Sequence, residues 1–557
     1  MKRWTWKTMA LGALCAMTGT VSLRAQRPAP DLVLTNGKII TVDERFSIAQ
    51  AIAVKGDRIL AVGTNQDIAQ LAGPNTRRID LRGRSVIPGL IDNHAHLLRA
   101  GITWQEEVRL DGVESRRQAV DMLRARVRAA APGKWIYTLG GWAHQQFADD
   151  KRPFAREELD EIAPNNPVVL QEAYYRSYLN SRAIQAAGLD AMTDRWIARD
   201  AAGKPTGIIE QDGVRIIAAK IPDPPKETFA LSTLAMIRDF NRAGLTAVGS
   251  SGCPEDQLAA YRQWEGQGQL NLRVFCINAL GAGNPEQVDR ILPQIAQIKL
   301  FQGGEYINHT VYGEQIYGPA GDNMLDVTPS QKPEDFVQWG RIAREVAKAG
   351  MPIHVHATLT ATIDGFLDQI EQIDKDYPIR NLRWALIHLD QINASHLERM
   401  KKLGMYAAVH ARPTILGELF HEIHGDRSYD MPPLKLVQDS GITWGLGTDT
   451  SVVDQYRPLT TLWWAVTGKM VGGVKVLRQT ISREDALIAH TRKNAYFHFQ
   501  ENNLGSIQAG KLADVVVLDR DYLTVPADQI KDIKVVMTIV GGRTVYDAGL
   551  QTSPATR

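Results

Sequence analysis

Two histidines close the apolar run VIPGLIDNHAH at residues 86–96, with a single alanine between them. Side chains two residues apart on a β-strand project from the same face. His94 and His96 can therefore bind one ion together, and imidazole nitrogen is a preferred ligand of Zn²⁺ and other first-row metal ions. The pair predicts a metal site at the end of a buried strand.

Later runs carry further side chains that can bind a metal. MPIHVHA at 351–357 contributes His354 and His356, ALIHLD at 385–390 contributes His388, GLGTDTS at 445–451 contributes Asp449, and QIKLFQGG at 297–304 contributes Lys299. Each alone has a plainer explanation: a core histidine, an ion-paired lysine, or an aspartate that caps a helix. Their recurrence at one strand end after another favours a shared metal centre.

The elements that must position these groups alternate between strand-like and helical runs, which indicates a parallel βα architecture. The strand-like runs are SVIPGLIDN, LTAVGS, LRVFCIN, IKLFQ, MPIHVHA, RWALIHL, MYAAVH and ITWGLGTD. Eight such units predict a closed (β/α)₈ barrel, in which catalytic groups sit at the C-terminal ends of the strands. The gap between the first two runs is too long for one helix, so residues from about 105 to 230 are expected to form an insertion.

Both ends of the chain are rich in short β-like runs. DLVLTNGKIITVD and SIAQAIAVKGDRILAVGT near the start, and GKLADVVVLDRD and IKVVMTIVGGRTVYDAG near the end, alternate with turn signals. We expect one small β-sandwich built from both termini. The predicted boundaries are 26–88 and 491–557 for the two parts of the sandwich and 89–490 for the barrel.

The first residues resemble a secretory signal. A basic MKRWTWK precedes a short apolar run and a small-residue cleavage site after Ala25. The run is short for a membrane span, although an uncleaved anchor is the alternative. Residues 1–25 are therefore expected to be removed on export to a bacterial periplasm or beyond. Cys253 and Cys276 then remain, and we expect them to be small buried hydrophobes, not a bridge.

The balance of charge excludes some partner classes. The chain has 557 residues, with 64 basic and 62 acidic side chains and a formal net charge of +2. No basic patch favours nucleic acid, and no later run is long and apolar enough to span a membrane. A small-molecule substrate is the expected partner, and a homo-oligomer is left open.

The motifs resemble the amidohydrolase superfamily, and within it amidohydrolase family 3, the YtcJ-like branch. VIPGLIDNHAH, GLGTD and KLADVVVLD carry the resemblance, together with GGW at 140–142, YLNSRAIQAAGL at 178–189, GKPTGIIE at 203–210 and AGLTAVGSSG at 243–252. It covers nearly all of the chain after the signal. It implies an α/β fold, a distorted (β/α)₈ TIM barrel with a composite β-sandwich, and a site for one or two divalent ions.

The resemblance also implies roles for single residues. Lys299 falls where a fourth-strand lysine can be carbamylated and bridge two ions, His356 matches the fifth-strand ligand with His354 in reserve, and Asp449 matches the eighth-strand carboxylate. The expected ligands are His94, His96, Lys299, His356, His388 and Asp449, and the expected ion is Zn²⁺. An ion of this kind lowers the pKa of a bound water. Asp449 is the expected catalytic residue, taking the water proton and passing it to the leaving nitrogen.

Groups near the substrate depart from the branch. Leu359 and Thr360 stand where it usually has Gly-Asp, and Tyr175 stands where it commonly has a histidine. Substrate preference is therefore not carried over. The pocket candidates are Trp142, His144, Tyr175, His309, Tyr312, His410 and Arg412.

The resulting function is a secreted metal-dependent amidohydrolase that cleaves a non-peptide C–N bond of the amide type. An esterase or lactonase on the same metal site is one alternative. A dipeptidase is another, with Arg412 available to hold a free carboxylate. The third is an inactive periplasmic binding protein with a relic barrel.

Overall fold

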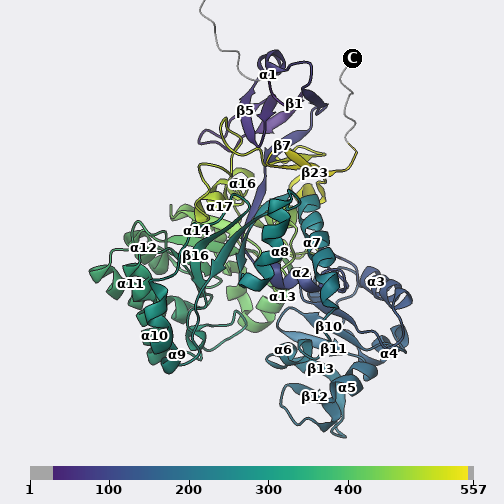
Figure 1. The fold of residues 1–557 in the computed structure, drawn as a ribbon. Coiled ribbons are helices and arrows are strands. Elements are labelled where there is room, and N and C mark those ends of the chain that lie inside the picture. The colour runs from purple at the N-terminus through teal and green to yellow at the C-terminus, as the bar shows by residue number, and fades with distance from the viewer. Residues whose placement is uncertain (1–28, 550–557) are drawn as a thin grey trace, which may run out of the picture.

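The computed structural model describes residues 29–549 and is built around an eight-stranded parallel sheet (Figure 1). Its strands, in the order in which they neighbour one another, are β8 (Leu90–Ala95), β14 (Leu245–Ser251), β15 (Arg273–Asn278), β16 (Ile307–Glu314), β17 (Ile353–Ala357), β18 (Ala385–His388), β19 (Tyr406–His410) and β20 (Trp444–Gly447). The first and last strands meet where Asp449 N donates to His94 O at 3.0 Å. The predicted (β/α)₈ barrel is confirmed.

Helices cover the outside of this sheet and connect its strands (Figure 1). They are α2 (Leu97–Thr103), α7 (Phe229–Ala243), α8 (Glu255–Gly266), α9 (Pro285–Ile295), α10 (Pro333–Lys348), α11 (Thr360–Asp376), α12 (Ala394–Leu403), α13 (Pro413–His424), α14 (Leu434–Asp439), α15 (Pro458–Thr467), α16 (Arg483–Ala489) and α17 (Arg492–Phe497). Helix α10 buries one apolar stripe that includes Trp339, Ile342 and Val346, whereas α15 is buried on nearly all sides. The core therefore lies between sheet and helices and leaves the strand ends free to carry the site.

The prediction for the fourth barrel strand is wrong. Residues 298–302 lie outside any strand, with Lys299 exposed and the Phe301 ring 44% exposed. The strand is instead β16, whose sequence INHTVYGE has the β-branched and aromatic residues that favour a pleated surface. Val311 and Tyr312 are fully buried there. The correction matters because β16 ends in Glu314.

The predicted first strand is divided between two sheets at Gly89. Residues before it form β7 (Ser85–Pro88), and residues after it form β8 of the barrel. A Cβ at Gly89 would lie 2.1 Å from Thr246 Oγ1, so only glycine allows β14 to approach this closely. The joint fixes the position of the barrel relative to the strands that precede it.

The β-rich ends of the chain pair with each other. One sheet has the order β5-β4-β1-β6 and the other β23-β22-β21-β7-β2-β3. Their bounds are β1 (Leu32–Thr35), β2 (Lys38–Ile40), β3 (Ile48–Ala49), β4 (Ala51–Lys55), β5 (Arg58–Gly63), β6 (Arg77–Asp80), β21 (Val515–Leu518), β22 (Val535–Val540) and β23 (Arg543–Asp547). Leu34, Val86, Val515 and Ile539 share one buried core. Both ends thus form one unit, above the barrel in Figure 1.

The long gap after β8 folds into a lobe beside the barrel (Figure 1). Its sheet has the order β12-β13-β11-β10-β9, with β9 (Ile136–Leu139), β10 (Val168–Glu172), β11 (Arg176–Leu179), β12 (Ile197–Arg199) and β13 (Pro205–Glu210). Helices α3 (Arg116–Ala129), α4 (Arg156–Ile162), α5 (Ser181–Ala187) and α6 (Gly213–Ala218) belong to it. The lobe has apolar cores of its own.

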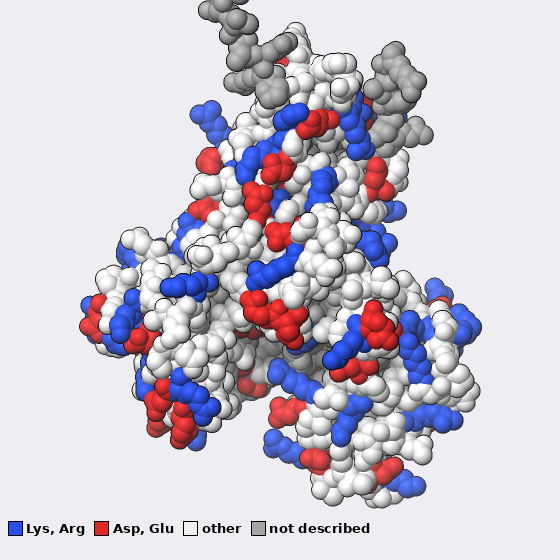
Figure 2. Space-filling view, in the orientation of Figure 1, with Lys and Arg blue, Asp and Glu red and all other residues white. Residues whose placement is uncertain are grey.

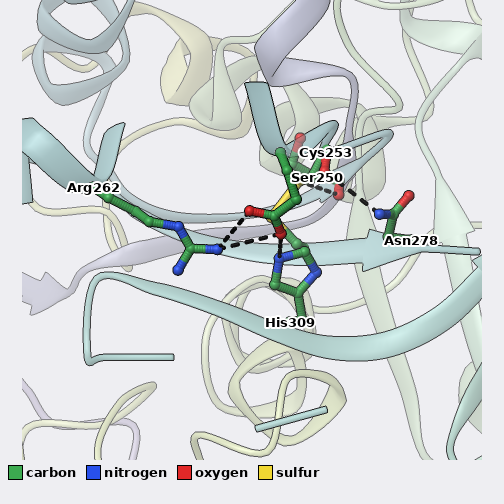
Figure 3. Close-up of a disulfide and its surroundings, with 7 residues drawn as sticks. Ser250, Cys253, Arg262, Asn278 and His309 are labelled. Atoms are coloured by element: carbon green, nitrogen blue, oxygen red, sulfur yellow. Dashed lines mark hydrogen bonds and ion pairs between the residues drawn. A yellow bond between two sulfur atoms is a disulfide. The ribbon is translucent and has the colours of Figure 1, made fainter. Parts of the chain in front are cut away.

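Cys253 and Cys276 form a disulfide, so the expectation that they are unpaired is wrong (Figure 3). Ser250 of β14 is in register with Cys276 of β15, and Cys253 follows three residues later. This parallel pairing brings the two Cα atoms to 5.9 Å. Pairing of strands across the sheet, which spacing in the sequence does not reveal, decides the bridge.

The visible surface is mixed in charge. Figure 2 shows basic and acidic side chains interspersed over the visible face. Between residues 29 and 549, none of the helices has the length and apolar character needed to cross a bilayer. The predicted signal at residues 1–25 lies outside the described residues.

Candidate metal centre and active site

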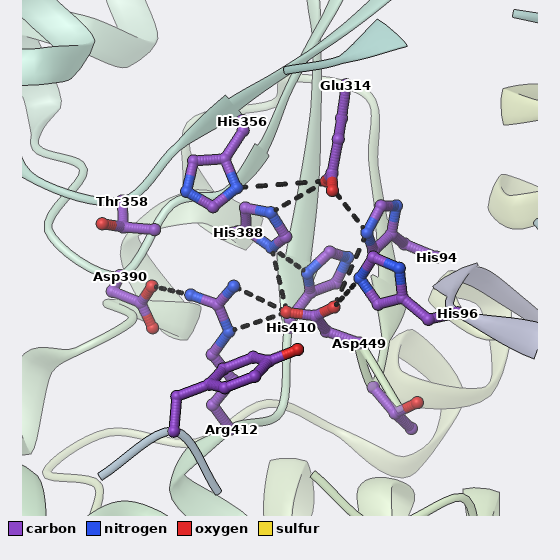
Figure 4. Close-up of polar contacts among 12 residues, drawn as sticks. His94, His96, Glu314, His356, Thr358, His388, Asp390, His410, Arg412 and Asp449 are labelled. Atoms are coloured by element: carbon purple, nitrogen blue, oxygen red, sulfur yellow. Dashed lines mark hydrogen bonds and ion pairs between the residues drawn. The ribbon is translucent and has the colours of Figure 1, made fainter. Parts of the chain in front are cut away.

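Imidazole and carboxylate groups from separate strands converge at the C-terminal mouth of the barrel (Figure 4). His94 lies near the end of β8 and Glu314 is the last residue of β16, with His94 Nε2 and Glu314 Oε2 3.0 Å apart. His388 ends β18, and its Nε2 lies 3.4 Å from the same oxygen. Asp449 follows β20, with Oδ1 3.3 Å from His96 Nε2 and 3.6 Å from His94 Nε2. Glu314 and Asp449 thus lie on either side of His94.

Several buried ligand atoms in this cluster have no hydrogen-bond partner among residues 29–549. These atoms are His94 Nε2, Glu314 Oε2 and His388 Nε2. Buried polar atoms are otherwise almost always paired, so an orphaned set that faces one point fits a bound cation. The three residues can offer atoms within 4.8 Å of one another, and so can His94, His96 and Asp449. Nitrogen and carboxylate donors of this kind suit Zn²⁺ and related ions.

The charges inside the cluster set its protonation. Burial raises the pKa of Asp449, but Arg412 and the neighbouring histidines outweigh burial and hold it well below its usual value. Burial also raises the pKa of Glu314, but His94 and His388 outweigh burial and hold that pKa well below its usual value. Burial, followed by Arg412, lowers the pKa of His388 well below its usual value. The carboxylates are therefore ionised and His388 is neutral, which are the forms that bind a metal. Burial lowers the pKa of His94, but Glu314 and Asp449 outweigh burial and raise it.

A chain of hydrogen bonds fixes which nitrogen of His388 carries the proton. The Asn494 amide nitrogen donates to two backbone carbonyls at 2.6 Å, so its oxygen is free to accept from Asn93 at 3.1 Å. Asn93 Oδ1 then accepts from His410 Nε2 at 3.1 Å, and bare His410 Nδ1 accepts from His388 Nδ1 at 2.6 Å. The unprotonated Nε2 of His388 therefore faces Glu314.

Arg412 holds the Asp449 carboxylate. Its Nη2 and Nε donate to Asp449 Oδ2 at 2.6 Å and 3.1 Å, and its Nη1 donates to Asp390 Oδ2 at 2.7 Å. Asp449 and His388 adopt left-handed backbone conformations, with φ of +64° and +78°. Strained backbone of this kind concentrates at functional sites. Because its guanidinium is buried between two aspartates, Arg412 is not free to hold a substrate carboxylate.

Asp322 orients His356 from the loop after β16. Its Oδ1 lies 3.0 Å from His356 Nε2, and its carboxylate accepts from the backbone N–H groups of Thr358 and Leu359. His356 Nδ1 is thereby turned towards Glu314 Oε2, 3.9 Å away. Asp322 thus acts on the expected fifth-strand ligand through a carboxylate–histidine contact.

The structure brings most of the predicted site residues together. Those in or around the cluster are His94, His96, His356, His388, His410, Arg412 and Asp449. Lys299 is not among them, because the segment that carries it is not the fourth strand and its side chain is exposed. Glu314 occupies the strand end that was assigned to the lysine.

The remaining candidates have other surroundings. Trp142 and Tyr312 are core residues that donate to Thr138 Oγ1 and Leu280 O. His144 pairs with Glu172 at 2.8 Å, and His309 pairs with Glu255 at 3.2 Å. Tyr175 is half-buried and packs against an apolar cluster that joins the insertion to α13. The reserve ligand His354 is buried against Phe497 and His498. None of these side chains lines the cleft above the cluster.

The sequence held signals for some residues that were missed. Glu314 ends a run of strand-forming residues, and Asp390 stands two residues after His388. Asn93 immediately precedes His94 on the same strand. Asp322 and Asn494 lie far along the sequence from His356 and His388, and only the fold brings them to the site.

A cleft of about 350 Å³ opens above the cluster. Its floor includes His96, Glu314, His356, His388 and Asp449. Its upper walls include Arg99, Tyr174, Arg215, Met324, Val452 and Val453. Figure 2 shows the surface hollowed between the insertion lobe and the lobe of α9–α12. Tyr174 and Arg215 come from the insertion, which therefore shapes the substrate cleft.

Known proteins resemble this chain in sequence or in fold over nearly its whole length. The chain is 27% identical to the N-substituted formamide deformylase of Arthrobacter pascens, over 93% of this chain and 98% of that protein. It is 24% identical to the Bacillus subtilis protein YtcJ, over 92% and 98%. An uncharacterized metal-dependent hydrolase from Pyrococcus furiosus shares the fold with a TM-score of 0.63, at 21% identity over 88% of this chain and 100% of that one. The family model described as "Amidohydrolase family" matches residues 77–546, and this chain therefore belongs to the amidohydrolase family.

Proposed function

We propose that this member of the amidohydrolases is a metal-dependent hydrolase that cleaves the C–N bond of a small N-substituted amide, with a formamide as the first substrate to test. The observation that carries the proposal is the set of orphaned ligand atoms of His94, Glu314 and His388, which lies beside Asp449 at the floor of the cleft. The full-length similarity to a formamide deformylase favours the formamide.

Bound at His94, His96, Glu314, His356, His388 and Asp449, zinc or a similar ion would supply Lewis acidity and lower the pKa of water. Asp449 is ionised and Arg412 fixes its Oδ2, which leaves Oδ1 for proton transfer. Water oxygen bonds to the formyl carbon as Asp449 takes its proton. The C–N bond then breaks, Asp449 gives the proton to the nitrogen, and the amine leaves with formic acid, which releases its remaining proton to solvent and becomes formate.

The proposal includes one or two ions, and Glu314 would be the carboxylate on β16 that helps to hold them. Its Oε2 faces His94 on one side and His388 and His356 on the other. A carbamylated lysine has no role in this arrangement, because Glu314 supplies the carboxylate that the carbamate would supply.

The site argues against a dipeptidase and against an inactive relic barrel, but it does not separate an amidase from an esterase or lactonase. The dipeptidase would need Arg412, which is occupied by Asp390 and Asp449. A relic barrel has no reason to keep orphaned ligand atoms on several strands. An ester or lactone differs only in the leaving atom, so matched substrates must separate these reactions.

Export is also part of the proposal. A disulfide persists in oxidising compartments, and the Cys253–Cys276 bridge agrees with a periplasmic or secreted protein. Fractionation of the source cells tests this, with the protein in the periplasm or medium as the expected result and retention in the cytoplasm as the contrary one.

The decisive experiment is hydrolysis by zinc-loaded protein of an N-alkylformamide, the matching acetamide and the matching formate ester. We expect formate release from the formamide, its loss on chelation, and its return with zinc. Faster hydrolysis of the ester than of the amide would replace the amidase with an esterase. No hydrolysis of any member after metal loading would overturn the proposed function.

A further inference from the structure

Two arginines at the mouth of the cleft share one tyrosine as their support. Arg99 lies on α2, and its Nη1 donates to the Tyr174 hydroxyl at 3.0 Å. Arg215 lies on α6 of the insertion, with its Cζ 4.5 Å from the centre of the Tyr174 ring. Tyr174 stands in the turn between β10 and β11. The half-buried ring therefore holds a guanidinium of the barrel and one of the insertion close together.

These two guanidinium groups have no carboxylate partner among residues 29–549. The third arginine that lines the cleft, Arg412, is ion-paired with Asp390 and Asp449. Arg99 and Arg215 are exposed, line the cleft and form no ion pair with any described residue. A pair of unneutralised guanidinium groups beside a substrate cleft is a ready site for an anion.

The acidic side chains near this mouth already pair with other groups and do not neutralise the two arginines. Glu107 lines the adjoining recess with both arginines, but it pairs with Arg109 at 3.0 Å and accepts from Thr103 at 2.6 Å. Asp322 lines the cleft and binds His356 and backbone N–H groups. The mouth is therefore locally positive, while the floor carries the metal-binding histidines and carboxylates.

We propose that Arg99 and Arg215 form an anion-binding subsite, and that the substrate carries a carboxylate or phosphate at the end remote from its scissile amide. This inference rests on the proposed function for the amide, but the anion subsite exists independently of turnover. Tyr174, which the insertion contributes, positions both guanidinium groups. The metal centre at the floor of the cleft would then bind the amide end of the substrate. Arg99 and Arg215 at the mouth would bind its anionic end.

The test compares substrates of one shape that differ in charge. The neutral probe is N-(4-methylbenzyl)formamide, and the anionic probes are 4-(formamidomethyl)benzoate and the corresponding 4-phosphonate. We expect zinc-loaded wild-type protein to prefer an anionic probe by about tenfold or more in kcat/KM, because hydrogen bonds to charged groups are the stronger ones. The larger of the two ratios tells a carboxylate substrate from a phosphate substrate.

The double variant Arg99→Gln/Arg215→Gln should bring the ratio of anionic to neutral kcat/KM to within about twofold of one. The ratio divides out any loss that both substrates share. The matched control is Arg290→Gln, an exposed arginine on α9 outside the cleft, which should keep the wild-type ratio. A wild-type ratio near one, or a high ratio retained by the double variant, would overturn the subsite.

Binding of non-hydrolysable analogues separates this proposal from the proposed function. The probes are N-(4-methylbenzyl)methanesulfonamide and its 4-carboxylate and 4-phosphonate analogues, measured by titration calorimetry with zinc-loaded protein. Tighter binding of a charged analogue, lost in the double variant, supports the subsite even when no formamide is hydrolysed. Equal affinity for all three analogues in the wild type refutes it, whatever the activity.

Discussion

His410 Nδ1 lies 2.6 Å from His388 Nδ1, inside a buried hydrogen-bond chain that begins at Asn494. Because Asn93 accepts from His410 Nε2, the short contact has only one consistent arrangement, with the proton on His388 Nδ1. His410 is thus a positioning residue that acts on the metal through His388. A substitution of His410 should therefore reduce metal affinity more than it reduces turnover by the metal-loaded protein.

Replacing His410 by alanine should weaken zinc binding by roughly 10–100-fold, the usual cost of losing a partner of a metal-binding histidine. The variant His410→Gln keeps an amide oxygen that can accept from His388 Nδ1, and it should recover part of the affinity. Competition with a chromophoric chelator measures both. Equal zinc affinity in wild type and His410→Ala would show that the hydrogen-bond chain does not position His388.

Glu314 and Lys299 give opposite expectations for metal content. Glu314→Gln removes the carboxylate that faces three histidines, so we expect loss of one ion per chain or a clear drop in affinity. Lys299→Ala changes an exposed side chain and should leave metal content unchanged, even with bicarbonate present. Elemental mass spectrometry of the purified proteins measures this. If Lys299→Ala alone lost metal, a carbamylated Lys299 would replace Glu314 as the proposed ligand.

Asp449→Asn should reduce kcat by about 10²–10⁴-fold, the range for removal of a general acid–base group. The amide keeps the shape and one oxygen, so the protein should keep most of its metal. Asp121→Asn, at an exposed position on α3, is the matched control and should behave as wild type. Full activity of Asp449→Asn would show that Asp449 does not transfer the proton.

The disulfide should stabilise the barrel wall beside the cleft. It closes a loop with a sequence separation of 23 residues, for which the chain-entropy model gives about 3 kcal/mol. The double variant Cys253→Ser/Cys276→Ser should unfold more easily by about that amount in denaturant titrations. Reduction of the wild type should reproduce the loss, and reducing agent should not affect the double variant. Equal unfolding free energies would show that the bridge adds nothing.

The sequence determined the barrel through local pattern. The strand runs that carry His94, His356, His388 and Asp449 alternate with amphipathic helices, and parallel strands bring their C-terminal ends to one mouth. The period of the hydrophobic residues is a short-range property, so it can be read along the chain. The candidate metal-ligating histidines could be predicted from the same pattern, because they stand at the ends of these strands.

Tertiary structure decided the contacts that join distant segments. QIKLFQGG and INHTVYGE compete for the fourth strand, and only packing against β15 and β17 selects the second and brings in Glu314. The bridge from Cys253 to Cys276 depends on strand pairing in the same way. Asn494 and Arg215 reach the site from the far C-terminal region and from the insertion. Burial and charge pairing across the fold are long-range effects, and no local spacing in the chain encodes them.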